Sequence, residues 1–476
     1  MRNKLGQFSL IIAGIIIGVA ISLNYSAVAQ RESASRQQLP LPIEELRAFT
    51  EVFGRVKQDY VEPVADKKLI TEAINGMLTG LDPHSAYLDQ EAFKEMQVGT
   101  QGEFGGLGIE VGMEDGFVKV ISPIDDTPAS RAGVMAGDLI VKLDDTAVKG
   151  MTLNDAVKQM RGKPNTPIRL TIVRKGEPNP LVLTLTRAVI KIQSVKATTL
   201  EPGYAYFRVS QFQEGTGELL ARAIETHVKG PMKGIILDLR NDPGGLLNSA
   251  VAVTAMFIEA GKLVVYTEGR AEDSKMRLNA SPEHYLRGRN RQDFVSRLPA
   301  DIKKLPMVVL VNGGSASASE IVAGALQDHN RAVVMGQQTF GKGSVQTILP
   351  LGNNTAIKLT TARYFTPNGR SIQAKGITPD ILLEGAIDKN ASLRLREADL
   401  TKHLDDGKSA VPDVKDADKE KALAAARAKY NFTPEVRPEI DLKELRPGPG
   451  EVVSKKDYEL NQAMVFLKSR GATGAD

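Results

Sequence analysis

The stretch PMVVLVNGGSASASEIVAGALQDHNRAVVMGQQTFGKGSVQTILP, residues 306–350, predicts a buried strand followed by a helix. Its apolar run Met307–Val311 is short and rich in β-branched residues, as a buried strand requires. Asn-Gly-Gly at 312–314 ends this strand. The helix is indicated by apolar residues that recur on one face: Ile321, Val322, Ala325 and Leu326.

Ser317 lies at the predicted turn from strand to helix. Backbone N–H groups at a helix N-terminus have no partner within the helix, and the helix dipole favours negative charge there. Such a place suits a nucleophile beside a site for an oxyanion. Small Ser/Ala runs also begin many helices simply as caps, and this alternative stays open on the residues alone.

Lys342 and Gln346 are predicted to point to the same side of the chain, because positions i and i+4 share a face in an extended segment. A lysine can serve a serine as base only when neutral. Its pKa must then fall from about 10.4 by roughly three units, or about 4 kcal/mol, which burial can supply. A neighbouring amide can hold the neutral amine without adding charge, so the pattern fits a Ser–Lys dyad with an orienting residue. A plain Gly-Lys-Gly turn is the alternative.

Taken together, the SASASE segment and the T-x-G-K-G turn resemble those of the C-terminal processing (tail-specific) peptidases, serine proteases of the periplasm and thylakoid lumen. The resemblance implies that Ser317 is the nucleophile, Lys342 the base and Gln346 the orienting residue. It also implies a ClpP/crotonase-like α/β core.

A second glycine turn follows the predicted buried strand 234–239 and leads into another helix. On the residues alone, Gly244 and Gly245 predict a turn with positive φ. The resemblance implies that the N–H of Gly244 or Gly245 joins that of Ala318 to form an oxyanion hole.

Residues 104–187 resemble a PDZ domain of the circularly permuted bacterial type, on the GLGIE loop and the segment 132–138. The N–H groups of Leu107, Gly108 and Ile109 are predicted to bind a C-terminal carboxylate. Val157 and Met160 are predicted to line a pocket for the last side chain of the peptide. The alternative for each apolar residue is a place in the domain core.

The N-terminus has the pattern of a secretory signal peptide. Arg2 and Lys4 precede an apolar run over 8–23, and an Ala-Val-Ala cleavage pattern follows at 27–29. We therefore expect a periplasmic protein; an uncleaved membrane anchor is the alternative. The chain has no cysteine, so packed cores must provide its stability.

The predicted organisation has six parts: signal peptide 1–29, linker 30–41, N-terminal helical segment 42–98, inserted PDZ domain 99–187, serine peptidase core 188–385 and polar helical C-terminal region 386–476. An apolar stripe over 46–60 makes the N-terminal helices a predicted surface for homo-oligomerisation or for an adaptor protein.

Other classes of function find little support. A net charge of +4 on 476 residues does not favour nucleic-acid binding. The five histidines show no metal-ligand spacing and no Walker loop is found, so we expect neither metal nor cofactor. A Ser–His–Asp triad stays open because its members need not be close in sequence. His329 is expected to point away from the nucleophile.

The sequence thus predicts a secreted serine endopeptidase whose substrates are proteins with accessible, mostly apolar C-termini. The alternative from another class is a non-catalytic PDZ scaffold on an inactive protease core. An acyl-CoA enzyme of the crotonase type is disfavoured by the secretory signal.

Overall fold

The computed structural model describes residues 41–124, 127–135, 137–191, 193–287, 292–383, 396–406, 428–435 and 451–472. The predicted signal peptide and nearly all of the predicted linker lie outside these residues, as does more than half of the predicted C-terminal region 386–476. The chain divides into two compact units, residues 1–73 and 74–476. No helix among the described residues has the length and apolar character needed to cross a membrane.

Helix α2 (Ile43–Asp59) dominates the described part of the first unit, and helix α3 (Asp66–Thr79) begins there. Glutamates in the first turn of α2 and Lys57 in its last turn suit the helix dipole. The predicted apolar stripe forms, yet α2 buries none of its residues. Leu46, Phe49 and Val52 are exposed.

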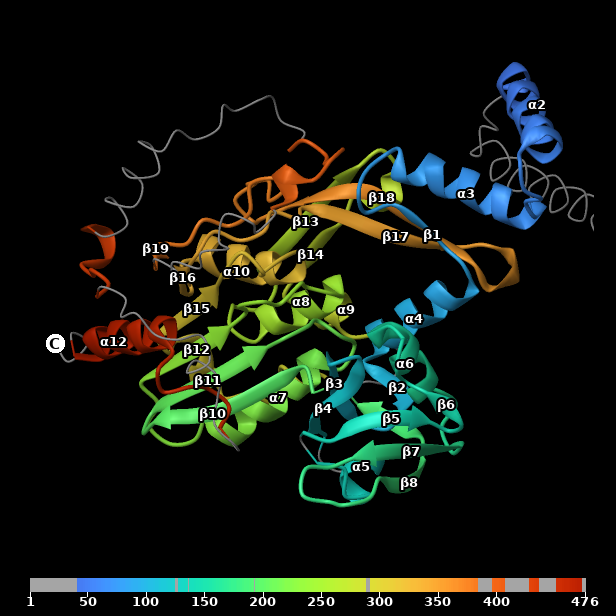
Figure 1. Ribbon diagram of the computed structural model, residues 1–476. Coiled ribbons are helices and arrows are strands. Elements are labelled where there is room, and N and C mark those ends of the chain that lie inside the picture. Colours follow the sequence, from blue (N-terminus) through green and yellow to red (C-terminus); the bar gives the residue numbers. More distant parts are fainter. Residues whose placement is uncertain are drawn as a thin grey trace, which may run out of the picture. The chain divides into compact units, whose positions relative to one another are not determined.

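A six-stranded sheet is the centre of the second unit (Figure 1). Its strands are parallel except at one edge, where the first pairs antiparallel with the second. Every residue of the two central strands is buried, as expected for a parallel sheet that is covered on both faces. In spatial order the strands are β10 (Val195–Glu201), β11 (Tyr204–Val209), β12 (Gly234–Asp238), β15 (Met307–Val311), β16 (Val333–Gly336) and β19 (Ile381–Leu382).

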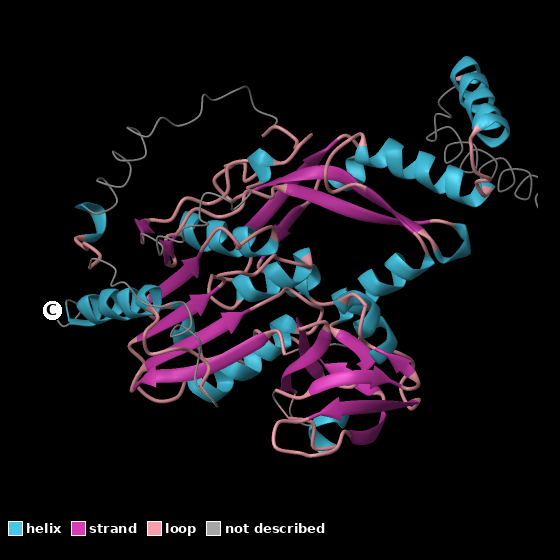
Figure 2. Ribbon diagram, in the orientation of Figure 1, coloured by secondary structure: helices cyan, strands magenta, loops and turns pink. Residues whose placement is uncertain are grey.

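Helices cover both faces of this sheet (Figure 2). On one face α7 (Thr216–His227), α8 (Leu247–Ala255) and α10 (Ala318–Asp328) pack in a core with Phe207 and Leu237. Helix α12 (Tyr458–Ala472) packs on the other face, where its Phe466 and Leu467 join Tyr206 and Ile236. The predicted helical C-terminal region 386–476 thus contains a helix at α12, and the apolar residues of that helix are buried against the sheet.

A second sheet is organised around a hairpin of two antiparallel strands, β17 (Ser344–Pro350) and β18 (Ala356–Phe365). Strand β18 is its centre and pairs antiparallel with β17 on one side and with β1 and β13 on the other. Strand β1 and helix α4 (Gln90–Gln101) were not predicted. The strands are β1 (Ala86–Leu88), β13 (Leu263–Gly269), β14 (Arg277–Asn279), β17 (Ser344–Pro350) and β18 (Ala356–Phe365).

The predicted PDZ segment has a core of its own, which includes Val118, Ile140 and Leu170. A Thr152–Asp155 capping box begins its longer helix, α6 (Leu153–Met160). The other helix is α5 (Pro128–Arg131). The strands are β2 (Glu103–Gly106), β3 (Ile109–Glu114), β4 (Phe117–Pro123), β5 (Leu139–Leu143), β6 (Thr146–Ala147), β7 (Pro167–Val173), β8 (Leu181–Thr186) and β9 (Ala188–Lys191).

Candidate active site

The two glycine-containing loops of the sequence meet at one edge of the parallel sheet. One follows β12 and the other follows its neighbour β15, and parallel strands end at the same edge. The carbonyl oxygen of Asp242 in the first loop accepts the N–H of Ala316 at 3.0 Å and the hydroxyl of Ser319 at 2.9 Å. The sheet topology therefore brings the predicted oxyanion loop against the predicted nucleophile.

Ser317 has an unusual backbone conformation, with φ 56° and ψ −112°. Such positive φ is costly for a residue with a side chain and persists only where its surroundings enforce it. Ser317 is half-buried between the buried Ala316 and Ala318, at the N-cap of α10. Helix α10 is buried around its whole circumference over 318–326, rather than along one face as predicted. The turn that holds Ser317 is therefore fixed by packing.

Glu320 joins the Ser317 turn to the Lys342 turn. Its Oε2 accepts the N–H groups of Ser317 at 2.7 Å and Lys342 at 2.9 Å. Its Oε1 accepts the hydroxyl of Thr339 at 2.6 Å and the N–H of Gly341 at 2.7 Å. Burial raises the pKa of Glu320 to about 7, although these four hydrogen bonds oppose the rise. Glu320 therefore acts through hydrogen bonds to the two turns.

Lys342 and Gln346 contact each other as their spacing predicts. The amine Nζ of Lys342 donates to Oε1 of Gln346 at 2.5 Å. Burial lowers the pKa of Lys342 to about 8, with help from the charge of Lys358. At pH 7 about a tenth of the molecules would then hold a neutral Lys342 amine. The side chain has the partner and the proton affinity that a general base needs.

Tyr364 is a third residue at this place, and the sequence analysis missed it. It lies on β18 with its ring buried, and its hydroxyl donates to the carbonyl oxygen of Lys342. Burial raises the pKa of Tyr364 well above its usual value, and the Ser317 side chain beside it offsets part of that rise. The neutral phenol thus lies near Ser317 and donates to the turn of Lys342. Nothing in the local pattern of its segment marked it.

Both loop glycines have positive φ, as predicted: 96° at Gly244 and 147° at Gly245. A Cβ on Gly244 would lie 2.6 Å from the oxygen of Ala316 and 2.8 Å from the nitrogen of Ala318. The Gly244 N–H already donates to Oδ1 of Asp242 at 2.8 Å. No hydrogen bond is found for the N–H of Gly245 or Ala318 among the described residues. Of the two glycines, Gly245 therefore has the N–H left for a ligand.

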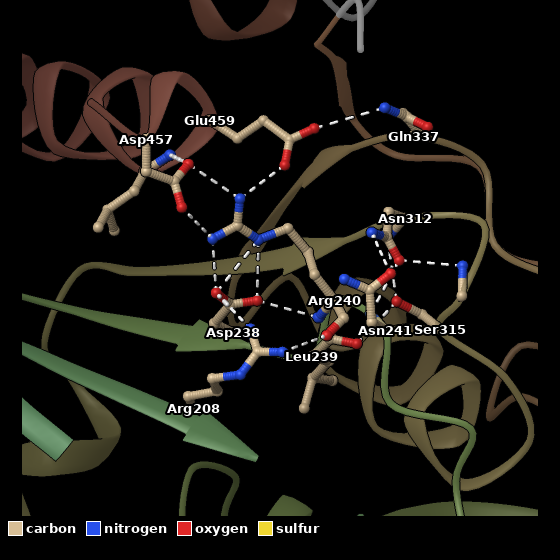
Figure 3. A network of polar contacts seen from close by, with 12 residues as sticks. Arg208, Asp238, Leu239, Arg240, Asn241, Asn312, Ser315, Gln337, Asp457 and Glu459 are labelled. Carbon is tan, nitrogen blue, oxygen red and sulfur yellow. Dashed lines mark hydrogen bonds and ion pairs between the residues drawn. The ribbon is translucent and has the colours of Figure 1, made fainter. Parts of the chain in front are cut away.

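Arg240 precedes this loop, and its guanidinium binds three carboxylates (Figure 3). Its guanidinium donates to Asp238 at the end of β12, at 2.6 Å. It also donates to Asp457 at 2.7 Å and Glu459 at 2.7 Å, both at the start of α12. Arg208 adds a bond to the carbonyl oxygen of Arg240 at 3.1 Å. The C-terminal helix thereby fixes the start of the predicted oxyanion loop.

Asn241 and Asn312 connect the two loops beside this network (Figure 3). The Asn241 N–H donates to Oδ1 of Asn312 at 2.9 Å, and Nδ2 of Asn312 donates back to Oδ1 of Asn241 at 3.0 Å. The hydroxyl of Ser315 donates to the carbonyl oxygen of Leu239 at 2.8 Å. These reciprocal bonds hold the loops after β12 and β15 in a single arrangement.

The predicted peptide-binding residues fall into two groups. Leu107 and Met160 are buried in the PDZ core, as the alternative reading of the sequence had it. Ile109 and Val157 are half-buried at its margin. Gly108 has φ 77°, and a Cβ there would lie 2.3 Å from Cβ of Thr127. The glycine is thus required for this loop to approach Thr127.

His329 and His84 each bind a group other than Ser317. His329 Nε2 contacts the carbonyl oxygen of Leu263 at 2.7 Å, so it points away from the nucleophile as expected. His84 pairs with the buried Glu397 at 2.8 Å. Among the described residues no histidine is found in a hydrogen bond with Ser317.

Comparison with known proteins identifies the class. Residues 203–383 match the model of peptidase family S41, residues 105–185 match the PDZ domain model, and residues 16–92 match the model described as the activating protease CtpB N-terminal domain. The chain is therefore a serine-type endopeptidase with a PDZ domain.

The curated relatives narrow this class to a family. The chain is 48% identical to the carboxy-terminal-processing protease of Bartonella bacilliformis, over 82% of this chain and 87% of the relative. It is 32% identical to the carboxy-terminal processing protease CtpA of Bacillus subtilis, over 84% and 81%. The structure of a photosystem II D1 C-terminal processing protease is 31% identical, covers 71% of this chain and 92% of its own, and has a TM-score of 0.41. The chain belongs to the carboxy-terminal-processing proteases of peptidase family S41.

Proposed function

We propose that this protease cleaves peptide bonds with Ser317 as nucleophile and Lys342 as general base. The observation that supports this most directly is the hydrogen bond from the partly buried Lys342 amine to Gln346, on a turn that Glu320 ties to Ser317. In the first step neutral Lys342 accepts the hydroxyl proton while Oγ of Ser317 attacks the carbonyl carbon. The protonated amine then donates to the leaving nitrogen, and an acyl-enzyme on Ser317 remains.

Deacylation repeats these roles with water as the nucleophile. Lys342, neutral again, accepts a proton from water as the water attacks the acyl carbon, and the proton then returns to Oγ of Ser317. In each half-reaction the N–H groups of Gly245 and Ala318 stabilise the negative carbonyl oxygen. Support for Gly245 over Gly244 comes from the Asp242 carboxylate, which already accepts the Gly244 N–H.

Substrate choice and location complete the proposal. The PDZ domain binds substrate C-termini near Ile109 and Val157, the half-buried residues at the edge of its core. The protein acts in the periplasm, on the strength of Arg2, Lys4 and the Ala-Val-Ala pattern at 27–29. The exposed apolar side chains of α2 provide the surface for a second copy or an adaptor protein.

Labelling with a fluorophosphonate tests the catalytic assignment. The label is expected on Ser317 of the wild-type chain, and Lys342→Ala should slow labelling and peptide hydrolysis together. Lys375→Ala is a control, because Lys375 pairs with Asp406 on the surface. Labelling of another serine, or full hydrolysis by Lys342→Ala, would overturn the dyad.

A further inference from the structure

Two residues far from the dyad in sequence, Asp82 and Thr360, are connected to Gln346 by hydrogen bonds. Nε2 of Gln346 donates to Oγ1 of Thr360 at 3.2 Å, and Thr360 donates to Oδ1 of Asp82 at 3.0 Å. Thr360 lies in the middle of β18, whereas Asp82 lies in the turn before β1. Pairing of β1 with β18 brings this turn to the active site.

The surroundings of Asp82 keep its carboxylate ionised, as an acceptor of hydrogen bonds. It is 3% exposed, and its Oδ1 accepts the N–H groups of His84 at 2.8 Å and Ser85 at 2.9 Å. Its Oδ2 accepts the Ser85 hydroxyl at 2.7 Å. Burial alone would raise the pKa of Asp82, but bonds from Ser85, His84 and Thr360 hold it below the usual value. An ionised carboxylate can only accept hydrogen bonds. The single hydroxyl proton of Thr360 must therefore point at Asp82.

The bond from Thr360 to Asp82 fixes the direction of the hydrogen bond between Thr360 and Gln346. Since the Thr360 proton is directed at Asp82, its oxygen can only accept from Gln346, and the NH₂ end of the amide must face it. Ser344 Oγ also accepts from Nε2, at 3.0 Å, but an unconstrained hydroxyl can donate or accept and does not decide the orientation. The amide oxygen of Gln346 is thereby turned towards Lys342.

The orientation matters for the lone pair of Lys342. A neutral amine that donates one N–H to Oε1 of Gln346 keeps its lone pair for the proton of Ser317. A reversed amide would direct N–H groups at the amine and occupy that lone pair. We infer that Asp82 and Thr360 are positioning residues that set the direction of the Gln346 amide and so keep the Lys342 lone pair available. This inference rests on the proposed Ser317–Lys342 dyad.

Four variants of the full chain test it by kcat and KM on one peptide substrate. Thr360→Val and Asp82→Asn should each lower kcat about 10- to 100-fold, which is the rate factor expected for the loss of one hydrogen bond to a charged group. The KM of each variant should stay within about twofold of the wild-type value. Thr360→Ser keeps the hydroxyl and should retain wild-type kcat. Thr361→Val is the matched control, because that neighbouring hydroxyl bonds to Thr347, at 2.6 Å, and not to the Gln346 amide.

The pH profile separates orientation from a purely structural role. The charged groups that face Lys342 are Lys358, Glu397, Glu320 and Asp82, and the negative charge of Asp82 raises the lysine pKa. Asp82→Asn should therefore move the acid limb of kcat/KM to lower pH. Thr360→Val should do the same, because a reversed amide no longer accepts from the protonated amine. Loss of folded protein alone would lower activity without moving that limb.

Lys342→Ala, measured in parallel, distinguishes a failure of the proposed Ser317–Lys342 dyad from a failure of the positioning role of Asp82 and Thr360. An active Lys342→Ala would refute the dyad itself. An inactive Lys342→Ala together with wild-type kcat and acid limb in Thr360→Val would overturn the role of Asp82 and Thr360 and leave the dyad intact. Thermal unfolding of each variant establishes that it folds; if Thr360→Val does not, an Asp82→Asn profile identical to wild type is the overturning result.

Discussion

The backbone N–H groups of Ser317 and Lys342 donate to the same oxygen atom, Oε2 of Glu320. Since one atom accepts both, the turn of the nucleophile and the turn of the base must lie side by side. The carboxylate is fully buried, and its four donors in the described part of the chain are three backbone N–H groups and the Thr339 hydroxyl, with no charged side chain among them. Its role is therefore to hold backbone, and a carboxylate is the only side chain that can accept all four bonds.

Glu320→Gln should lower kcat at least tenfold while the protein still folds. The amide must direct its NH₂ group at two of the four donors, so at least one of the two turns loses its acceptor. Asp328→Asn is the control on the same helix, since Asp328 lies at the other end of α10 and pairs with the partly exposed Arg370. Steady-state kinetics and circular dichroism check both variants. Wild-type kcat in Glu320→Gln would contradict the holding role.

The pH dependence of activity follows from Lys342. The base must be neutral, and it loses its proton as pH rises, so kcat/KM should increase up to about pH 8 and then level off. The unfolded chain keeps the ordinary value of about 10.4, so it binds more protons than the folded chain between about pH 8 and 10.4. The Lys342 contribution to stability therefore rises with pH through this window. Lys342→Met should remove both effects, as activity and denaturant titrations at several pH values would reveal.

Tyr364→Phe should lower kcat about tenfold without a comparable loss of stability. The ring stays in the core, while the hydroxyl that lies near Ser317 and donates to the Lys342 carbonyl is removed. Fluorophosphonate labelling of Ser317 should slow in parallel. Tyr285→Phe is the matched control: its buried hydroxyl bonds to Asp293 at 2.7 Å, away from the dyad. An equal loss of activity in both variants would mean that Tyr364 acts only through general packing.

The carboxylates of α12 should contribute measurably to stability. Asp457→Asn combined with Glu459→Gln weakens the charge-assisted bonds to Arg240, which is mostly buried. We expect a loss of about 1.5–3 kcal/mol in the free energy of unfolding, and a lower kcat because the oxyanion loop loosens. Lys468 of the same helix forms an exposed ion pair with Glu201 of β10, and Lys468→Met should cost less than about 1 kcal/mol. Equal costs in urea titrations would refute a special role for the Arg240 network.

A peptide with a free C-terminal carboxylate should change the cleavage of a separate reporter, whereas its amidated twin should not. Stimulation would indicate that the PDZ domain favours a competent arrangement, because a ligand shifts an equilibrium only by binding one state better. Inhibition would indicate that the domain only tethers substrates. Identical rates with both peptides would contradict carboxylate recognition.

The sequence alone determined the elements whose signals are local. The strand before Ser317, the helix after it, the hairpin over β17 and β18 and the contact of Lys342 with Gln346 all follow from periodicity or spacing over a few residues. These features depend on backbone geometry, which a short segment sets by itself. Which surface buries the apolar residues of α12 is different, because that depends on the sheet which the helix meets.

Only the tertiary structure decided how these elements work together. The contacts of Glu320 with Lys342, of Tyr364 with Lys342, of Thr360 with Asp82 and of Arg240 with α12 join segments that are distant in the chain. The same is true of the loop glycines, since only the position of the Asp242 carboxylate distinguishes the N–H of Gly244 from that of Gly245. Burial, proton affinity and the direction of a hydrogen bond depend on which groups surround an atom, and no local pattern of residues contains that information.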